Sequence, residues 1–233
     1  LPHVSLYLDS AMTAENSAEV GADHIVLATG ASWRRDGVGR HHSRPLTIAD
    51  GALVLTPDDV MAGSLPAAGP VTLFDDDHYY LGGVLAELLV KKGLAVRLVT
   101  PSSLVSFFTR QSLEQARIQK RLLELGVEVI ANTAVTAIAP DHVTLACVFT
   151  GRERLLETAA TLLVTARTPN DALAAPLRAA GLAVSVIGDA FGPATIAAAV
   201  HAGRRLAEDF GRPKDPLSLP FRRETTGLDP APV

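Results

Sequence analysis

Three consecutive aspartates and a histidine, residues 75–78, follow the apolar run Val71–Phe74. Carboxylates and imidazole are side chains that bind divalent cations, so this cluster could form a metal site. Neighbouring residues on a single turn seldom all converge on one ion. We therefore favour a second interpretation, in which the carboxylates form a solvated cap at the start of the following helix, where the helix dipole attracts negative charge.

The segments around these aspartates have the pattern of a βαβ unit. Val71–Phe74 predicts a strand, an amphipathic helix follows, and Ala95–Val99 predicts a second strand. In dinucleotide-binding folds the turn before the helix carries G-x-G-x-x-G, so that the backbone can approach a pyrophosphate. Here Asp75, Asp77 and Tyr80 occupy the glycine positions. Because carboxylates take the space and the favourable potential that phosphate needs, we predict that NADH and NADPH do not bind.

Other chemically capable side chains have simpler interpretations. Cys147 is the single cysteine and lies in an apolar stretch, where we expect a buried small hydrophobe. One cysteine cannot hold an iron-sulfur cluster. A loop at residues 32–51 could contact a phosphate or a neighbouring domain, but we expect it to be solvated. Its cationic residues are Arg34, Arg35, His41, His42 and Arg44, and we assign Trp33, Tyr79 and Tyr80 to packing or interdomain contacts.

Composition excludes several classes of protein. The 233 residues are 48% hydrophobic and 20% charged, which is sufficient for one large or two small domains. A net charge of -4 gives no reason to expect nucleic acid or an anionic membrane surface as a partner. No apolar run approaches the roughly 20 residues that span a bilayer, and no signal pattern opens the chain. We therefore expect a cytoplasmic protein with no membrane contact.

The remaining pattern predicts one domain inserted into part of another. Residues 134–157 alternate like an antiparallel meander, and residues 161–165 form a buried strand. Further predicted elements are a strand at 4–8, a helix capped by Thr13, a strand at 24–28, a helix opened by a capping box at 112–115, a strand at 184–187 and a helix from about 196. Residues 212–233 contain five prolines and predict an extended arm or a disordered tail.

Three of these segments resemble landmarks of flavoprotein reductases that have two dinucleotide-binding domains. They are the strand ending Ala28-Thr29-Gly30, the strand ending in residues 167–170, and residues 187–189 before a helix. More narrowly, the chain resembles the C-terminal third of the trimethylamine, dimethylamine and histamine dehydrogenases, iron-sulfur flavoproteins related to Old Yellow Enzyme. The degenerate turn at residues 75–80 is the most specific part of this resemblance, which also includes residues 28–37 and 219–224.

The resemblance implies a larger parent enzyme. A flavin-binding β/α barrel with FMN, a four-iron four-sulfur cluster and an intact glycine fingerprint would all lie upstream of Leu1. The parent would oxidise a small amine and pass electrons through FMN and the cluster to a carrier such as electron-transferring flavoprotein. We expect this portion to be non-catalytic, and we name no catalytic residue. It would contribute a structural ADP or FAD site, interdomain packing and part of a homo-oligomer interface.

We therefore predict an α/β fold. Residues 32–160 would form a Rossmann-like, NAD(P)-binding-like domain with a parallel sheet and an antiparallel meander. This domain would be inserted into a partial FAD- or ADP-binding-like domain formed by residues 1–31 and 161–211, with residues 212–233 as a C-terminal arm.

The resemblance also predicts the cofactor contacts, in which an acidic residue faces the sugar part of bound ADP or FAD. The expected residues are Ala28, Thr29, Gly30, Gly188, Asp189 and Thr195. The structural alternative is that Gly188 permits close strand-helix packing and Asp189 helps to cap the helix. Two other functions stay open: an NADPH-dependent reductase of the dienoyl-CoA reductase type, and a stand-alone binding module without catalysis. The degenerate turn and the absence of an acidic residue at Val99-Thr100-Pro101 speak against the first.

Overall fold

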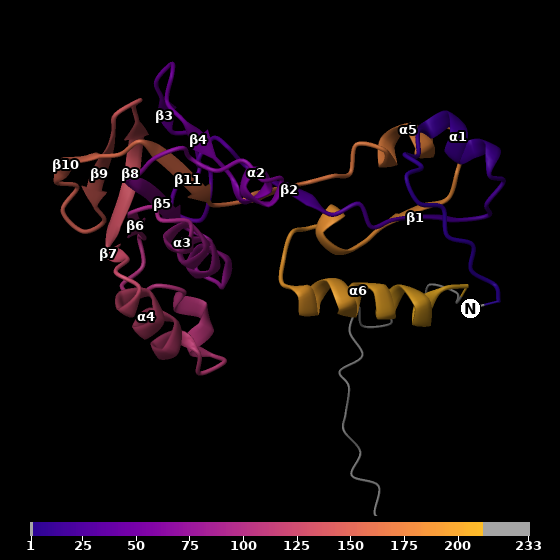
Figure 1. Ribbon diagram of the computed structural model, residues 1–233. Helices are drawn as coiled ribbons and strands as arrows, with labels where there is room; N and C mark the ends of the chain where they lie inside the picture. Colours follow the sequence, from indigo (N-terminus) through magenta and orange to yellow (C-terminus); the bar gives the residue numbers. More distant parts are fainter. Residues whose placement is uncertain (1, 212–233) are drawn as a thin grey trace, which may run out of the picture.

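The computed structural model describes residues 2–211, and two lobes joined by a narrow ribbon are visible (Figure 1). The ribbon consists of β2 (Ala31–Trp33) and β12 (Arg167–Pro169), which pair in antiparallel register. The large lobe contains the elements between these two strands, and the small lobe contains those before β2 and after β12. The predicted arm at residues 212–233 lies outside the described residues.

A five-stranded parallel sheet forms the centre of the large lobe. Its order is β4 (Val54–Leu55), β11 (Ala160–Val164), β5 (Val71–Asp75), β6 (Val96–Val99) and β7 (Glu128–Ile130). Every residue of β5 and β11 is buried, as expected for parallel strands that are covered on both faces. The strand at 160–164 therefore belongs to this sheet, so the domain boundary that we expected after residue 160 runs through the sheet.

The two faces of this sheet carry different layers. Helices α3 (Leu81–Lys91) and α4 (Gln115–Glu124) pack on one face through a core that includes Leu73, Leu85 and Leu122. On the other face lies an antiparallel meander, and Phe74 and Leu145 belong to the core there. The meander consists of β8 (Thr133–Ile138), β9 (His142–Cys147) and β10 (Glu153–Glu157), with β3 (Thr47–Ile48) parallel to β8. The predicted α/β fold with a parallel sheet and an antiparallel meander is confirmed.

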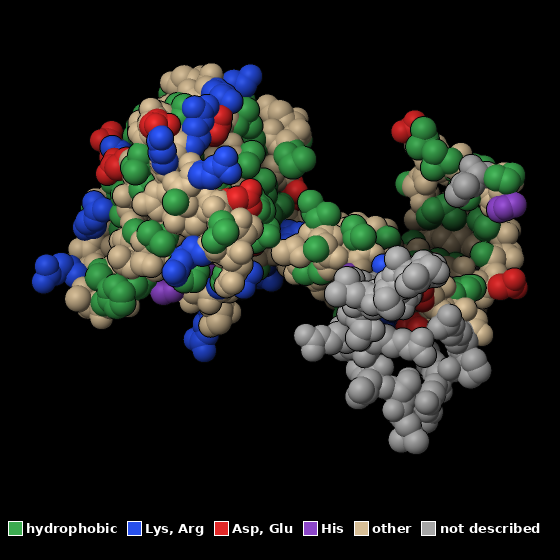
Figure 2. Space-filling model, turned by 90° about the horizontal axis from the view of Figure 1, so that it is seen from below, with side chains coloured by type: hydrophobic (Ala, Val, Ile, Leu, Met, Phe, Trp, Pro, Cys, Tyr) green, Lys and Arg blue, Asp and Glu red, His purple; other side chains and the backbone are tan. Residues whose placement is uncertain are grey.

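Among residues 2–211, the small lobe is built on two paired strands. β1 (Ile25–Leu27) lies parallel to β13 (Val184–Val186), and α1 (Ala14–Glu19) and α5 (Ala174–Ala179) pack nearby around Leu27 and Leu177. The 3-10 turn η2 (Gly188–Ala190) and helix α6 (Ile196–Asp209) follow, and α6 has no buried residue. In Figure 2 most of the visible Lys and Arg side chains lie on the large lobe, interspersed with Asp and Glu.

Two local predictions are wrong. Residues 4–7 have no secondary structure, and Val4 and Leu6 are exposed, because no neighbouring strand among residues 2–211 pairs with them. Ser112 does not cap α4, since its hydroxyl donates to Thr109 O and to Glu114 instead. The helix therefore begins later, at Gln115. The cap predicted at Thr13 is present, since its Oγ1 accepts a hydrogen bond from Asn16 N at 3.3 Å.

The short elements complete the large lobe. Helix α2 (Pro57–Met61) follows β4, and the 3-10 helix η1 (Phe107–Arg110) precedes α4. Cys147, at the end of β9, is half-buried rather than buried, and a hydrogen bond with Thr150 lowers the pKa of its thiol. No helix among residues 2–211 is both long and apolar enough to cross a bilayer.

Candidate functional site

Asp75 is completely buried at the carboxyl end of β5. Its Oδ1 accepts a hydrogen bond from the backbone N–H of His78 at 3.0 Å. Its Oδ2 lies against the first turn of α3, where a Cβ at Gly82 would be only 2.6 Å away. Burial raises the pKa of Asp75 to about 6. The prediction of a solvated cap is therefore wrong here, because the helix packs directly onto the carboxylate.

Asp76 is also completely buried, because a loop of the large lobe covers it. Its Oδ2 accepts a hydrogen bond from His41 N at 2.8 Å, and its Oδ1 lies 3.3 Å from Nε2 of His78. A Cβ at Gly39 would be 2.2 Å from the same Oδ2, so only glycine permits this approach. His42 Nε2 lies 2.7 Å from Val135 O. The backbone of the loop thus packs on the sheet edge at Gly39 and His41, while the side chains of Arg35, His41 and Arg44 are exposed, as expected for a solvated loop. Partial burial lowers the pKa of His41.

These contacts fill the place where a dinucleotide binds in related architectures. In open parallel sheets, ligands bind at the carboxyl ends of the strands where the strand order reverses, which here lies between β5 and β11. Asp75 and Asp76 occupy that edge, and a backbone N–H of the covering loop already bonds to Asp76. Asp77 lies beside them, where burial raises its pKa and Arg167 and Arg40 oppose the increase.

A metal site at this cluster finds no support. Within residues 2–211, no three His, Cys, Asp or Glu side chains are grouped so that they could hold a metal ion. One oxygen of each carboxylate, Asp75 Oδ1 and Asp76 Oδ2, accepts a backbone N–H, and Gly82 and Gly39 approach Oδ2 of Asp75 and of Asp76 closely. The packing around the carboxylates is therefore that of a closed sheet edge.

The second predicted site lies in the small lobe, at the carboxyl edge of the two-stranded sheet. β1 and β13 are parallel, and Ile187 N donates a hydrogen bond to Leu27 O at 2.9 Å. Residues 28–30 and 188–189, which follow the two strands, therefore lie at the same edge. Gly188 has φ +59, a left-handed conformation that favours glycine. Gly30 is likewise left-handed, with φ +74.

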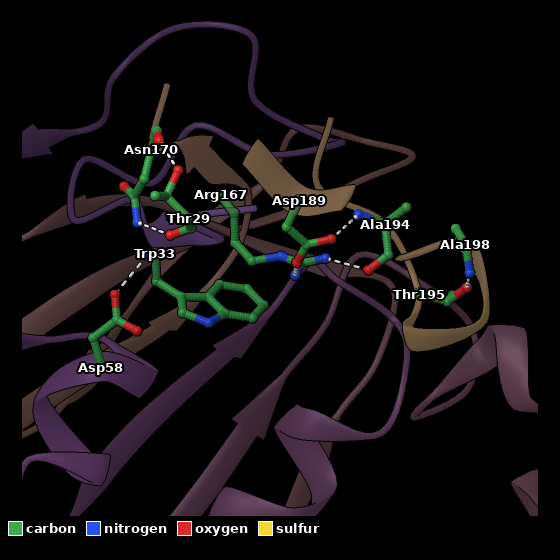
Figure 3. Close-up of polar contacts among 9 residues, drawn as sticks. All are labelled: Thr29, Trp33, Asp58, Arg167, Asn170, Asp189, Ala194, Thr195 and Ala198. Atoms are coloured by element: carbon green, nitrogen blue, oxygen red, sulfur yellow. Dashed lines mark hydrogen bonds and ion pairs between the residues drawn. The ribbon is translucent and has the colours of Figure 1, made fainter. Parts of the chain in front are cut away.

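Asp189 is held on both of its oxygens (Figure 3). Oδ1 accepts a hydrogen bond from Ala194 N at 3.1 Å, and Oδ2 accepts one from Nη1 of Arg167. Thr195 begins α6 as a cap, since its Oγ1 accepts a hydrogen bond from Ala198 N at 3.4 Å. Thr29 donates its hydroxyl proton to the backbone oxygen of Asn170. The structure thus brings the predicted residues of both segments to one edge, with Asp189 and Thr195 in a single loop.

Arg167 is the contact that the sequence did not reveal, because residues 167–170 were predicted only as the end of a strand. Besides its ion pair with Asp189, Nη2 donates to Ala194 O at 2.7 Å. The guanidinium carbon lies 5.3 Å from the centre of the Trp33 ring, and Trp33 N donates to Asp58 Oδ2. A sequence signal did exist: an arginine directly after a buried strand, where the chain passes between two domains.

Comparison with known proteins agrees with this architecture. Residues 55–170 match the family described as the OYE-like second alpha/beta domain. Dimethylamine dehydrogenase of Hyphomicrobium sp. (strain x) is 31% identical over 241 residues, covering 91% of this chain and 33% of that protein. The structure of histamine dehydrogenase from Rhizobium sp. 4-9 is 45% identical with a TM-score of 0.89, covering 95% of this chain and 36% of that one. The chain is homologous to the dimethylamine and histamine dehydrogenases.

A further amine-oxidising relative has the same fold. The 6-hydroxypseudooxynicotine amine oxidase from Pseudomonas geniculata N1 is 38% identical, with a TM-score of 0.87, and the match covers 91% of this chain and 32% of that one. The chain thus spans about a third of the length of the relatives that it matches. Its residues 55–170 match the OYE-like second alpha/beta domain, and over this third of their length the dimethylamine and histamine dehydrogenases are its homologues.

Proposed function

We propose that this chain is the non-catalytic, dinucleotide-binding-like portion of a flavin-dependent amine dehydrogenase. Its small lobe would contribute a structural site for ADP or FAD, and its large lobe would serve in interdomain and subunit packing. The proposal rests on one observation: residues 28–30 and 188–189 lie at the same edge of the sheet formed by β1 and β13.

The polar side chains at this edge suit the sugar part of ADP or FAD. A carboxylate offers about four lone-pair positions, so Asp189 can accept ribose hydroxyl groups in addition to its two present donors. Its side chain is 24% exposed and therefore accessible to a ligand. The hydroxyls of Thr29 and Thr195 belong to the two segments that frame this edge. A glycine-rich turn for the phosphates does not occur beside it among residues 2–211, so the site accounts for only part of the cofactor.

The family resemblance extends the proposal to the parent protein. FMN and a four-iron four-sulfur cluster would lie in an N-terminal barrel of the same polypeptide. Electrons from a small amine would pass through them to a carrier such as electron-transferring flavoprotein. The parent would be a homo-oligomer, and the large lobe would form part of its interfaces.

An NADPH-dependent reductase of the dienoyl-CoA reductase type is the second candidate. It would require the inserted domain to bind NADPH at the edge that Asp75 and Asp76 occupy. The end of β6 at Val99-Thr100 also lacks the acidic residue that holds a ribose in many dinucleotide-binding domains. Both observations favour the first proposal. A stand-alone binding module without catalysis would share the small-lobe site, and only the sequence that precedes Leu1 in the gene distinguishes it.

Amide chemical shifts during titration with ADP test the proposal. We expect saturable changes at residues 28–30 and 188–189, and none at residues 75–83. Asp189→Asn should weaken binding, whereas Asp171→Asn, an exposed aspartate in the same lobe, should not. Shift changes confined to residues 75–83, or none at millimolar ADP, would contradict the proposal.

A further inference from the structure

Arg167 lies where the two lobes meet. It is the first residue of β12, just after β11 leaves the sheet of the large lobe. Its side chain reaches the loop of the small lobe that precedes α6, where it contacts Asp189 and Ala194 O. The guanidinium also stacks on Trp33, which is fixed to α2 of the large lobe through its N–H bond to Asp58. This side chain therefore connects the loop of the small lobe to Trp33 of the ribbon, which is itself bonded to the large lobe (Figure 3).

We propose that Arg167 is a positioning residue, which holds the loop 188–195 in register with the large lobe and orients the Asp189 carboxylate for a ligand. The orientation requires two donors. Ala194 N bonds to Oδ1 and Arg167 bonds to Oδ2, so the carboxylate cannot rotate without breaking one of these bonds. Ala194 is itself bonded to Arg167 through its carbonyl oxygen, which closes a ring of three contacts.

The chemistry of this ring suits arginine specifically. The guanidinium is planar and presents several N–H donors in a fixed arrangement, so that Nη1 and Nη2 can serve two different acceptors while the flat face stacks on an indole. A lysine ammonium keeps the charge but lacks the planar face and the fixed fork. The ion pair is partly shielded from water, because the Arg167 and Asp189 side chains are 21% and 24% exposed, and the exposed part of Asp189 remains open to a ligand.

The charges around Arg167 support the same arrangement. Asp189 lies on the small lobe, and the half-buried Asp77 of the large lobe interacts electrostatically with the same guanidinium. Arg167 thus lies between a carboxylate of each lobe. Its loss would leave Asp189 without its cation and would remove an attraction that joins the lobes.

Trp33 makes the arrangement measurable, because it is the single tryptophan of the chain. In Arg167→Ala the indole loses its stacked guanidinium, so we expect its fluorescence to shift to longer wavelength as water gains access. Amides of residues 188–195 should exchange faster with solvent. Arg167→Lys should also speed this exchange, which shows that charge alone does not suffice. Arg97→Ala is the matched control, since Arg97 bonds Glu128 and Glu157 O within the large lobe and should leave both signals unchanged.

A third measurement rests on the proposed function. If ADP binds at Asp189, both Arg167 variants should weaken its binding by about tenfold, the scale of one hydrogen bond to a charged group. Unchanged affinity in Arg167→Ala would overturn the positioning role. If the wild-type chain does not bind ADP, the proposed cofactor site is wrong. Amide exchange at residues 188–195 and Trp33 fluorescence then still test whether Arg167 positions this loop. The positioning role of Arg167 would be overturned if both variants matched the wild type in amide exchange at residues 188–195 and in Trp33 emission. If Arg167→Ala does not fold, Arg167→Lys alone tests the role by the same two measurements.

Discussion

Replacing Asp75 by asparagine should stabilise the protein at neutral pH. Asp75 is completely buried, and its Oδ2 has no hydrogen-bond partner among residues 2–211. The asparagine side chain would keep an oxygen to accept the His78 N–H bond while removing a buried negative charge. The variant therefore tests whether the buried carboxylate destabilises the folded protein or stabilises it as a helix cap.

The magnitude follows from the pKa. Burial raises the pKa of Asp75 from 3.8 to about 6, so the folded state binds the proton more tightly than the unfolded state. At about 1.4 kcal/mol per pKa unit, the shift corresponds to about 3 kcal/mol. The stability of the wild type is fully present below the unfolded pKa and is lost as pH rises through about 6. Asp75→Asn should not lose this stability, so above pH 6 its free energy of unfolding should exceed that of the wild type by up to about 3 kcal/mol.

Urea unfolding followed by circular dichroism at several pH values between 4 and 7 measures the difference. The two proteins should have similar free energies of unfolding near pH 4, and the variant should become the more stable one as pH rises. Asp50→Asn, at an exposed position of the large lobe, is the control and should change little. A variant that is less stable than the wild type by the same amount at every pH would show that the Asp75 carboxylate stabilises the fold.

Three further predictions concern packing, colour and assembly. Gly39→Ala should lower the free energy of unfolding by about 1–3 kcal/mol, because its methyl would lie 2.2 Å from Oδ2 of Asp76; urea unfolding at wild-type stability would contradict this contact. The purified chain should be colourless and inactive with amines and dye acceptors, and a flavin absorption band that persists through gel filtration would show otherwise. The chain should self-associate through the small lobe, where β1 and β13 pair only with each other among residues 2–211 and Ile196 and Val200 are exposed. Amides of residues 24–28 should then become better protected as protein concentration rises, whereas concentration-independent protection would argue against association.

Apolar runs predicted most of the fold, because buried parallel strands have a direct signature in sequence. The strand Val71–Phe74, the meander and the helix from Ile196 are all present. Predictions that depended on polar residues were less successful. Asp75 and Asp76 are typical of solvated turns, yet the loop through Gly39 and the helix at Gly82 bury them. That loop lies more than 30 residues earlier in the chain, so no local pattern could place it there.

The candidate site could likewise be predicted from the sequence only in part. The residues after β1 and β13 could be paired from sequence, because parallel strands end at a common edge. The role of Arg167 could not, because its partners Asp189 and Ala194 lie more than 20 residues later in the chain, in a loop of the small lobe that no local pattern places beside Arg167. Trp33 was assigned to packing or interdomain contacts, and its stacking with Arg167 at the junction agrees with that prediction.

The inserted domain keeps a dinucleotide-binding fold, and its own carboxylates close the edge of the sheet where a nucleotide would bind. Calorimetric titration of the chain with NADH and with NADPH at moderate ionic strength tests it most directly. We expect no saturable heat with either nucleotide, since Asp75 and Asp76 occupy the sheet edge and Asp76 already accepts a hydrogen bond from His41 N. Saturable binding of either nucleotide at micromolar concentration would contradict it.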